Sequence, residues 1–266
     1  MRSWFNSTNS GSTFKQWNRA AVEARGRYLW FAESDDYADP ELLRVLVDRL
    51  EREPSVGLAY CQSREVSEEG ILGQNFTEYT ADLDPGRWNQ DFTNRGTDEI
   101  ARFMFVKNTI PNASAVLIRR SAWDRAGGAD ESLRLCGDWL LWVRILADSD
   151  LAFAAAPLNY FRHHSSSVRA NRMRTLLFVW ERYNVMDFIL KHAPVADDLR
   201  EAMCGRMADL WQIYAAEDPE ARAWHSRVYR AARRVDPRLH TRLFNKTLRP
   251  WLGSVKNRFK RLLHQN

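Results

Sequence analysis

Apolar residues recur at helical spacing in two segments near the start of the chain. Residues 15–24 carry small and apolar side chains on one face, and Gly26 follows as a helix-ending residue. Asp39 and Pro40 are typical of a helix start, and a stripe of Leu and Val positions continues from there to Leu50. The pattern therefore predicts two amphipathic helices, separated by about fifteen residues.

Short apolar runs between these and later helices predict strands. Residues 28–32 lack polar alternation, which predicts a strand buried on both faces as in a parallel sheet. Residues 57–62 and 113–119 predict two more strands, and residues 158–162 a further short one. Residues 138–147 have a helical pattern. Strands that alternate with helices indicate an α/β fold.

The chain becomes almost entirely helical in pattern after residue 170. Prolines separate the four predicted helical segments, which are residues 171–192, 196–215, 219–234 and 237–262. We therefore expect an α/β domain over residues 1–169, followed by a helical C-terminal region over residues 170–266.

Composition supports a folded protein in a reducing compartment. The chain has 266 residues, of which 45% are hydrophobic, so a large core can form. Its 3 cysteines are widely spaced, which argues against a disulfide framework or a zinc site. No apolar run is long enough to span a membrane, and the first residues lack the core of a signal peptide. The 11 tryptophans either fill the core or, alternatively, provide flat surfaces on which sugar rings stack.

The net charge of +5 is concentrated at the C-terminus. Residues 220–266 contain 13 Lys and Arg residues but only 2 acidic residues. Between residues 243 and 263 the apolar positions form one helical stripe opposite basic residues. This segment either packs on the domain or rests on an anionic membrane surface. With no base-reading module beside it, we expect no nucleic-acid partner. We expect a cytoplasmic protein, with a peripheral position at the inner face of the membrane as the further expectation.

Three carboxylates directly follow the strand predicted at residues 28–32. Glu33, Asp35 and Asp36 lie in the sequence FAESDD. Hard cations such as Mg²⁺ or Mn²⁺ bind carboxylate and phosphate oxygens, and ligands of open α/β sheets bind at the carboxyl ends of strands. The alternative is that Ser34, Asp35 and Asp36 only cap or solvate the turn before the helix at Pro40. An aspartyl phosphotransferase would need Lys and Asp elements that we do not find.

Two further polar motifs occur downstream. Asp138 opens the predicted helix in the sequence CGDWLLW, where it is either an N-cap or a catalytic acid or base. Arg162, His163 and His164 cluster with serines in the sequence NYFRHHSSSV. Arg offers a planar donor pair to phosphate, and neutral His can bind a metal, although a solvated polar loop has the same composition.

In this order the three motifs resemble the inverting family 2 glycosyltransferases of GT-A fold. The resemblance covers residues 9–169 and implies a Rossmann-like mixed sheet. It also implies transfer of a sugar from a nucleotide-diphosphate donor to a hydroxyl of a saccharide or lipid-linked acceptor, with inversion, as in polysaccharide biosynthesis. A divalent metal, Mg²⁺ or Mn²⁺, would be the cofactor.

The resemblance also implies roles for individual residues. Glu33 and Asp35 match the DXD element, with Asp36 adjoining, and Asp138 matches the catalytic base. Arg162, His164 and Ser167 match the segment near the donor diphosphate. The implied metal ligands are Asp35, Asp36 and His164.

One departure concerns the start of the domain. The DXD element of the family follows three strands, whereas about thirty residues precede Glu33 here. We therefore expect a mixed sheet that lacks its first strands, an apolar strand edge at residues 28–32, and weak binding of nucleotide sugars by this N-terminally truncated chain. The alternative function is that of a catalytically inactive fragment or interaction module derived from such an enzyme.

Overall fold

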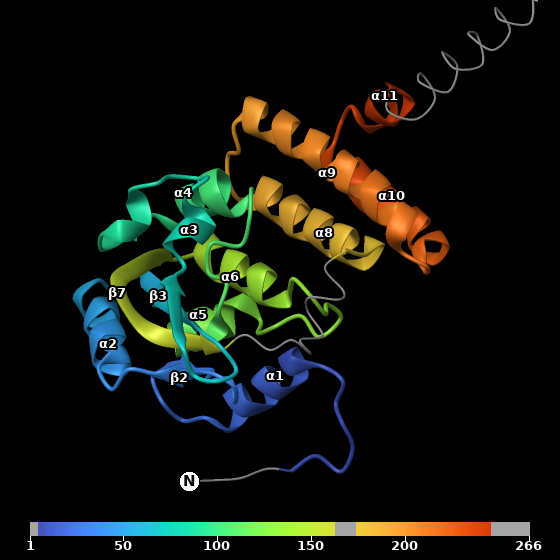
Figure 1. The fold of residues 1–266 in the computed structure, drawn as a ribbon. Coiled ribbons are helices and arrows are strands. Elements are labelled where there is room, and N and C mark those ends of the chain that lie inside the picture. Colours follow the sequence, from blue (N-terminus) through green and yellow to red (C-terminus); the bar gives the residue numbers. More distant parts are fainter. Residues whose placement is uncertain (1–4, 163–173, 246–266) are drawn as a thin grey trace, which may run out of the picture. The chain divides into compact units, whose positions relative to one another are not determined.

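The computed structural model describes residues 5–162 and 174–245, and its contacts divide the chain into two compact units (Figure 1). The first unit consists of residues 1–173 and 188–195, and the second of residues 174–187 and 196–266.

A seven-stranded mixed sheet forms the centre of the first unit. Its strands are β1 (Tyr28–Trp30), β2 (Tyr37–Ala38), β3 (Val56–Val66), β4 (Leu72–Asn75), β5 (Phe92–Asn94), β6 (Val116–Arg119) and β7 (Asp150–Arg162). The order is β1-β6-β3-β7-β2, with β4 paired to β3 and β5 paired to β7. The predicted α/β fold is therefore confirmed, and the strands expected at residues 57–62 and 158–162 are the parallel pair β3 and β7.

Helical segments connect the strands of this unit. They are α1 (Thr13–Glu23), α2 (Leu42–Arg52), α3 (Thr77–Thr80), η1 (Arg87–Asn89), α4 (Gly96–Glu99), the π-helical η2 (Ile100–Met104), η3 (Ala113–Ala115), α5 (Arg120–Ala126) and α6 (Gly137–Ala147). The two helices expected near residues 15–24 and after Pro40 correspond to α1 and α2. The strand expected at residues 113–119 begins later, because its first three residues form η3.

Strand direction decides where the loops meet. β6 runs antiparallel to both β1 and β3, and β3 runs parallel to β7. It follows that β1, β3 and β7 run in the same direction. Their carboxyl ends therefore lie at the same end of the sheet as the start of β6. The expectation that residues 28–32 sit between parallel neighbours is wrong: the strand covers residues 28–30 and its described partner, β6, is antiparallel. Leu29 is nevertheless buried, while Tyr28 and Trp30 pack on the core from the other face.

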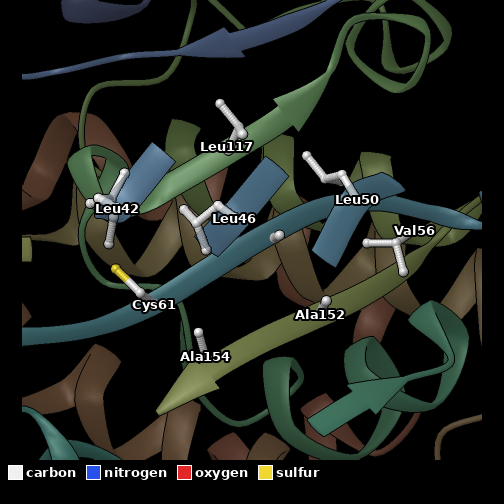
Figure 2. Close-up of a cluster of buried hydrophobic side chains, with 10 residues drawn as sticks. Leu42, Leu46, Leu50, Val56, Cys61, Leu117, Ala152 and Ala154 are labelled. Carbon is white, nitrogen blue, oxygen red and sulfur yellow. The ribbon is translucent and has the colours of Figure 1, made fainter. Parts of the chain in front are cut away.

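The core on one side of the sheet lies beneath α2. Leu42, Leu46 and Leu50 recur every four residues, so they form one face of the helix and pack on small residues of the sheet. Figure 2 shows these leucines over Ala152 and Ala154 of β7. The short side chains let the helix approach the sheet closely. All five side chains are at most 1% exposed, which indicates a well-packed interface.

The opposite side of the sheet is covered by α5 and α6 (Figure 1). An aromatic cluster joins α1 to these helices: Trp17 stacks on Phe31 with ring centroids 5.0 Å apart, and Phe31 lies 5.0 Å from Trp123. Trp17 also lies 6.2 Å from the fully buried Trp142 of α6. These tryptophans therefore serve the core, which is the first of the two roles considered from composition.

The second unit is helical, as predicted. It contains α9 (Asp197–Glu217), α10 (Ala221–Val235), α11 (Leu239–Leu243) and the first part of α8 (Leu176–His192). Asp-Pro pairs at residues 218–219 and 236–237 separate these helices, and both Asp side chains accept hydrogen bonds from neighbouring groups. Asp218 accepts hydrogen bonds from the N–H groups of Leu176 and Glu220, and Asp236 accepts from the N–H of Arg238 and from the Arg242 side chain. The amphipathic stripe predicted at residues 243–263 lies almost wholly outside the described residues.

We predict that Gly96→Ala destabilises the first unit. An added Cβ would lie 1.9 Å from the Ser149 carbonyl oxygen and 2.1 Å from that of Leu146, both backbone atoms that cannot move independently. The expected loss is about 2–3 kcal/mol in the free energy of unfolding, measured by urea denaturation. Gly86→Ala is the control, because its nearest contact would be 3.8 Å away. Equal stability of the two variants would contradict the packing described here.

Candidate active site

The predicted acidic cluster lies in the loop that follows β1. Each of its three carboxylates has a different environment: the Asp35 side chain is exposed, Glu33 lines a cavity, and Asp36 is partly buried. Burial raises the pKa of Asp36, while hydrogen bonds from Ser114, the Arg162 N–H and Asn112 oppose that rise. The three residues that form one motif in the sequence therefore differ in their availability to a ligand.

The turn before β6 holds this acidic loop in place. Ser114 Oγ accepts a hydrogen bond from the Glu33 N–H at 3.0 Å, and its carbonyl accepts one from Trp30 Nε1 at 2.8 Å. Asn112 caps η3, since its Oδ1 accepts from the Ser114 N–H at 2.9 Å. Asn112 and Ser114 are both buried. Two neutral side chains thus connect the end of β1 to the start of β6.

Arg162, at the end of β7, is a second anchor of the acidic loop. Its N–H donates to Asp36 Oδ1 at 3.1 Å, and its guanidinium donates to the carbonyl oxygens of Asp35, Ser67 and Glu68 at 3.2–3.3 Å. The side chain therefore ties the acidic loop to the end of β3. Its predicted role in donor binding stays a prediction.

Asp138 lies in the first turn of α6, where the positive end of the helix dipole favours a carboxylate. Its Oδ1 accepts from the Trp139 N–H at 2.7 Å, and its Oδ2 accepts from Asn108 Nδ2 at 3.2 Å. Gly137 precedes it, and an added Cβ there would lie 2.3 Å from the Phe14 ring. The glycine therefore lets α1 pack directly against the start of α6.

A cavity of about 580 Å³ contains both Glu33 and Asp138, which are about a hundred residues apart in the chain. Its walls come from the loop before α1 and α1 itself, the acidic loop, the turn before β6, the loop before α6 with the start of that helix, and the end of β7. The lining residues are Asn9, Ser10, Gly11, Ser12, Thr13, Phe14, Gln16, Trp17, Glu33, Pro111, Asn112, Ala113, Leu133, Arg134, Leu135, Asp138 and Phe161. Arg134 also donates a hydrogen bond to the Gly11 carbonyl, which joins the two loops on one side of the cavity. A volume of this size is typical of small-molecule binding sites.

The structure describes only some of the remaining predicted site residues. His164 and Ser167 lie outside the described residues. Within the described part of the chain, no group of three or more His, Cys, Asp or Glu side chains is arranged to hold a metal. Proteins bind Mg²⁺ through one or two carboxylates together with substrate phosphates and water, and the metal ligands expected at Asp35 and Asp36 stay a prediction.

Sequence reasoning did not select Asn108, Ser114 or Arg134 for this site. The pattern Asn112-Ala113-Ser114 before an apolar run is typical of a capped turn, and this was the available signal for Ser114. Asn108 and Arg134 carry no such local signal.

Comparison with known proteins identifies the family. Residues 5–125, which include the acidic loop and the turn before β6, match the family described as Glycosyl transferase family 2. This segment of the chain belongs to glycosyl transferase family 2.

Curated relatives of this chain include uncharacterized proteins of mycobacteria. An uncharacterized protein of Mycobacterium tuberculosis, MT1568, is 26% identical over 206 residues, which are 74% of this chain and 60% of that protein. An uncharacterized protein of Mycobacterium bovis, Mb1547, is 25% identical over 146 residues, which are 54% of this chain and 37% of that protein. The chain thus spans less than two thirds of the length of these relatives.

Solved structures support the fold of this chain. The crystal structure of S. aureus TarS 1–349 in complex with UDP-GlcNAc aligns with a TM-score of 0.60 at 15% identity, covering 95% of this chain and 70% of that chain. The complex of the same TarS fragment with UDP aligns with a TM-score of 0.50 over 79% of this chain and 52% of that chain. The mixed sheet of GT-A type followed by helices is confirmed. No described helix is long and apolar enough to cross a membrane.

We predict that Ser114→Ala destabilises the first unit, because the partly buried Glu33 N–H then loses its hydrogen-bond acceptor. The expected cost is about 1–3 kcal/mol in the free energy of unfolding, measured by urea denaturation. Ser55→Ala, at an exposed position, is the control and should change it by less than about 0.5 kcal/mol. If Ser114→Ala were as stable as the control, the turn before β6 would not be the anchor of the acidic loop.

Proposed function

We propose that this protein transfers a sugar from a nucleotide-diphosphate donor to an acceptor hydroxyl, with inversion at the anomeric carbon. The observation that carries the proposal is the single cavity that contains both Glu33 and Asp138 in a chain with a family 2 segment. Inverting transfer needs one group that binds the leaving diphosphate and a separate carboxylate that accepts a proton. The two sides of the cavity supply one each.

In the proposed reaction Asp138 is the base. Its partly exposed carboxylate takes the proton of the acceptor hydroxyl, whose oxygen attacks the anomeric carbon of the donor sugar. The bond from that carbon to the diphosphate oxygen breaks, and its electron pair stays with the leaving diphosphate. The hydrogen bond from the Trp139 N–H and the start of α6 hold the carboxylate in place.

The proposed donor site lies at the acidic loop. Glu33, Asp35 and Asp36 would hold a Mg²⁺ or Mn²⁺ ion together with diphosphate oxygens, and His164 is the further predicted ligand. The ion supplies positive charge for the leaving diphosphate. UDP-sugars are the first donors to test, because UDP-GlcNAc and UDP are bound in the TarS structures. A saccharide or lipid-linked acceptor follows from the family resemblance.

We predict that Asp138→Asn abolishes sugar transfer while the fold is kept. Loss of a general base lowers kcat by about 10²–10⁴-fold, and Asn can still accept the Trp139 N–H hydrogen bond. The assay incubates the purified chain with UDP-sugars, Mn²⁺ and saccharide acceptors, and measures UDP release together with the glycosylated product.

Asp124→Asn is the matched control, because it removes the same charge from an exposed position of α5. Full activity of Asp138→Asn would refute the role of Asp138 as the base. A wild-type chain that binds none of the UDP-sugars would instead favour the interaction module derived from such an enzyme.

We further predict that Mn²⁺ binding in the presence of UDP depends on Asp35. Removing one carboxylate from a site with few protein ligands should weaken the affinity by about tenfold or more. Electron paramagnetic resonance of free Mn²⁺ during titration measures this for wild type, Asp35→Asn and the control Asp124→Asn. Unchanged Mn²⁺ affinity in Asp35→Asn would remove Asp35 from the proposed metal site.

A further inference from the structure

Asp138 has a neutral hydrogen-bond donor on the side away from its own helix. Asn108, in the loop between η2 and η3, donates from Nδ2 to Asp138 Oδ2 at 3.2 Å. Asn108 is 5% exposed, so the donor side of this contact is buried. The other charged side chains that line the cavity, within the described residues, are Glu33 and Arg134.

The orientation of the Asn108 amide is fixed by a second hydrogen bond. The Ile110 N–H donates to Asn108 Oδ1 at 3.1 Å. An N–H can donate only to the amide oxygen, so the oxygen must face Ile110 and the NH₂ group must face Asp138. The fully buried Ile110 fixes the backbone from which the N–H projects.

A buried ion pair supports the same loop. Thr109 Oγ1 donates to Glu99 Oε1 at 3.4 Å. Glu99 has no exposed surface and accepts from Arg87 at 2.6 Å and from Asn94 at 2.8 Å. Burial raises the pKa of Glu99, and the charge and hydrogen bond of Arg87 counteract this rise. Because Glu99 is fully enclosed and paired, Thr109 and its neighbour Asn108 are held on a rigid support.

We propose that Asn108 is a positioning residue for Asp138 in the sugar transfer. This inference rests on the function proposed above and adds to it the group that orients the base. Two fixed donors, the Trp139 N–H and the Asn108 NH₂, hold both carboxylate oxygens and so define which lone pairs face the acceptor hydroxyl. A neutral amide does this without a positive charge, which would weaken the carboxylate as a base.

The test compares Asn108→Asp with wild type in UDP release, over a range of pH. Asp keeps the shape of the side chain and its acceptor for the Ile110 N–H, but it places a second carboxylate beside Asp138. We expect kcat to fall about tenfold or more, and the acidic limb of the kcat/KM profile to move up by about one pH unit or more. The KM for the donor should stay within about twofold, because Asn108 is not on the wall of the cavity.

Asn89→Asp is the control, since it makes the same change at an exposed position. An Asn108→Asp pH profile at the wild-type position would mean that the side chain of residue 108 does not act on Asp138, and this result would overturn the proposal. If Asn108→Asp does not fold, Asn108→Ser is the variant that tests the proposal. Its hydroxyl still reaches the Ile110 N–H but is too short for Asp138, and an unshifted profile with full kcat would again overturn the proposal. Absence of transfer by the wild-type chain would instead refute the proposed function itself.

Discussion

The antiparallel pairing of β1 with β6 is the constraint on which the candidate site depends. The register pairs Leu29 with Ile118 and Trp30 with Leu117. The chain that leaves β1 must therefore pass the chain that enters β6, so the acidic loop and the Asn112–Ser114 turn meet at one edge of the sheet. Ser114 then accepts the Glu33 N–H and the Trp30 side chain within a few residues of this pairing. A shift of register by one residue would turn these contacts to the other face.

The acidic side chains of the candidate site differ in their surroundings and therefore in their roles. Asp36 is held by donors from β7 and from the turn before β6, so its carboxylate stabilises the loop as well as adding charge. Asp35 is exposed, and Glu33 lines the cavity. Asp138 is held by a backbone N–H and a neutral amide. In the proposed reaction, Glu33, Asp35 and Asp36 bind the donor diphosphate and its metal, and Asp138 is oriented to accept a proton.

The elements with strong local patterns could be predicted from the sequence. α2 follows from the stripe of leucines after Pro40, and the helices of the second unit follow from their prolines and helical periodicity. The acidic loop and the start of α6 also carry local signals, namely the carboxylates after an apolar run and Asp138 after Gly137. Such patterns report burial of one face and the cost of ending a helix, which act over a few residues.

Features that depend on contacts between distant segments could not be predicted. The antiparallel neighbour of β1 lies about ninety residues away, and nothing in residues 28–32 distinguishes it from a parallel neighbour. The Arg162 guanidinium donates to three backbone carbonyl groups that only the fold brings together, while its role at a phosphate stays a prediction. Asn108 is an ordinary polar residue in the sequence, and its significance comes from its distance to Asp138.

The most direct measurement is a crystal structure of this chain with a UDP-sugar and Mn²⁺. The central claim is that the acidic loop and Asp138 serve one substrate. We predict that the diphosphate and the metal lie at Glu33, Asp35 and Asp36, with the anomeric carbon of the sugar facing Asp138 across the same cavity. A nucleotide sugar bound outside this cavity, or one whose sugar points away from Asp138, would contradict it.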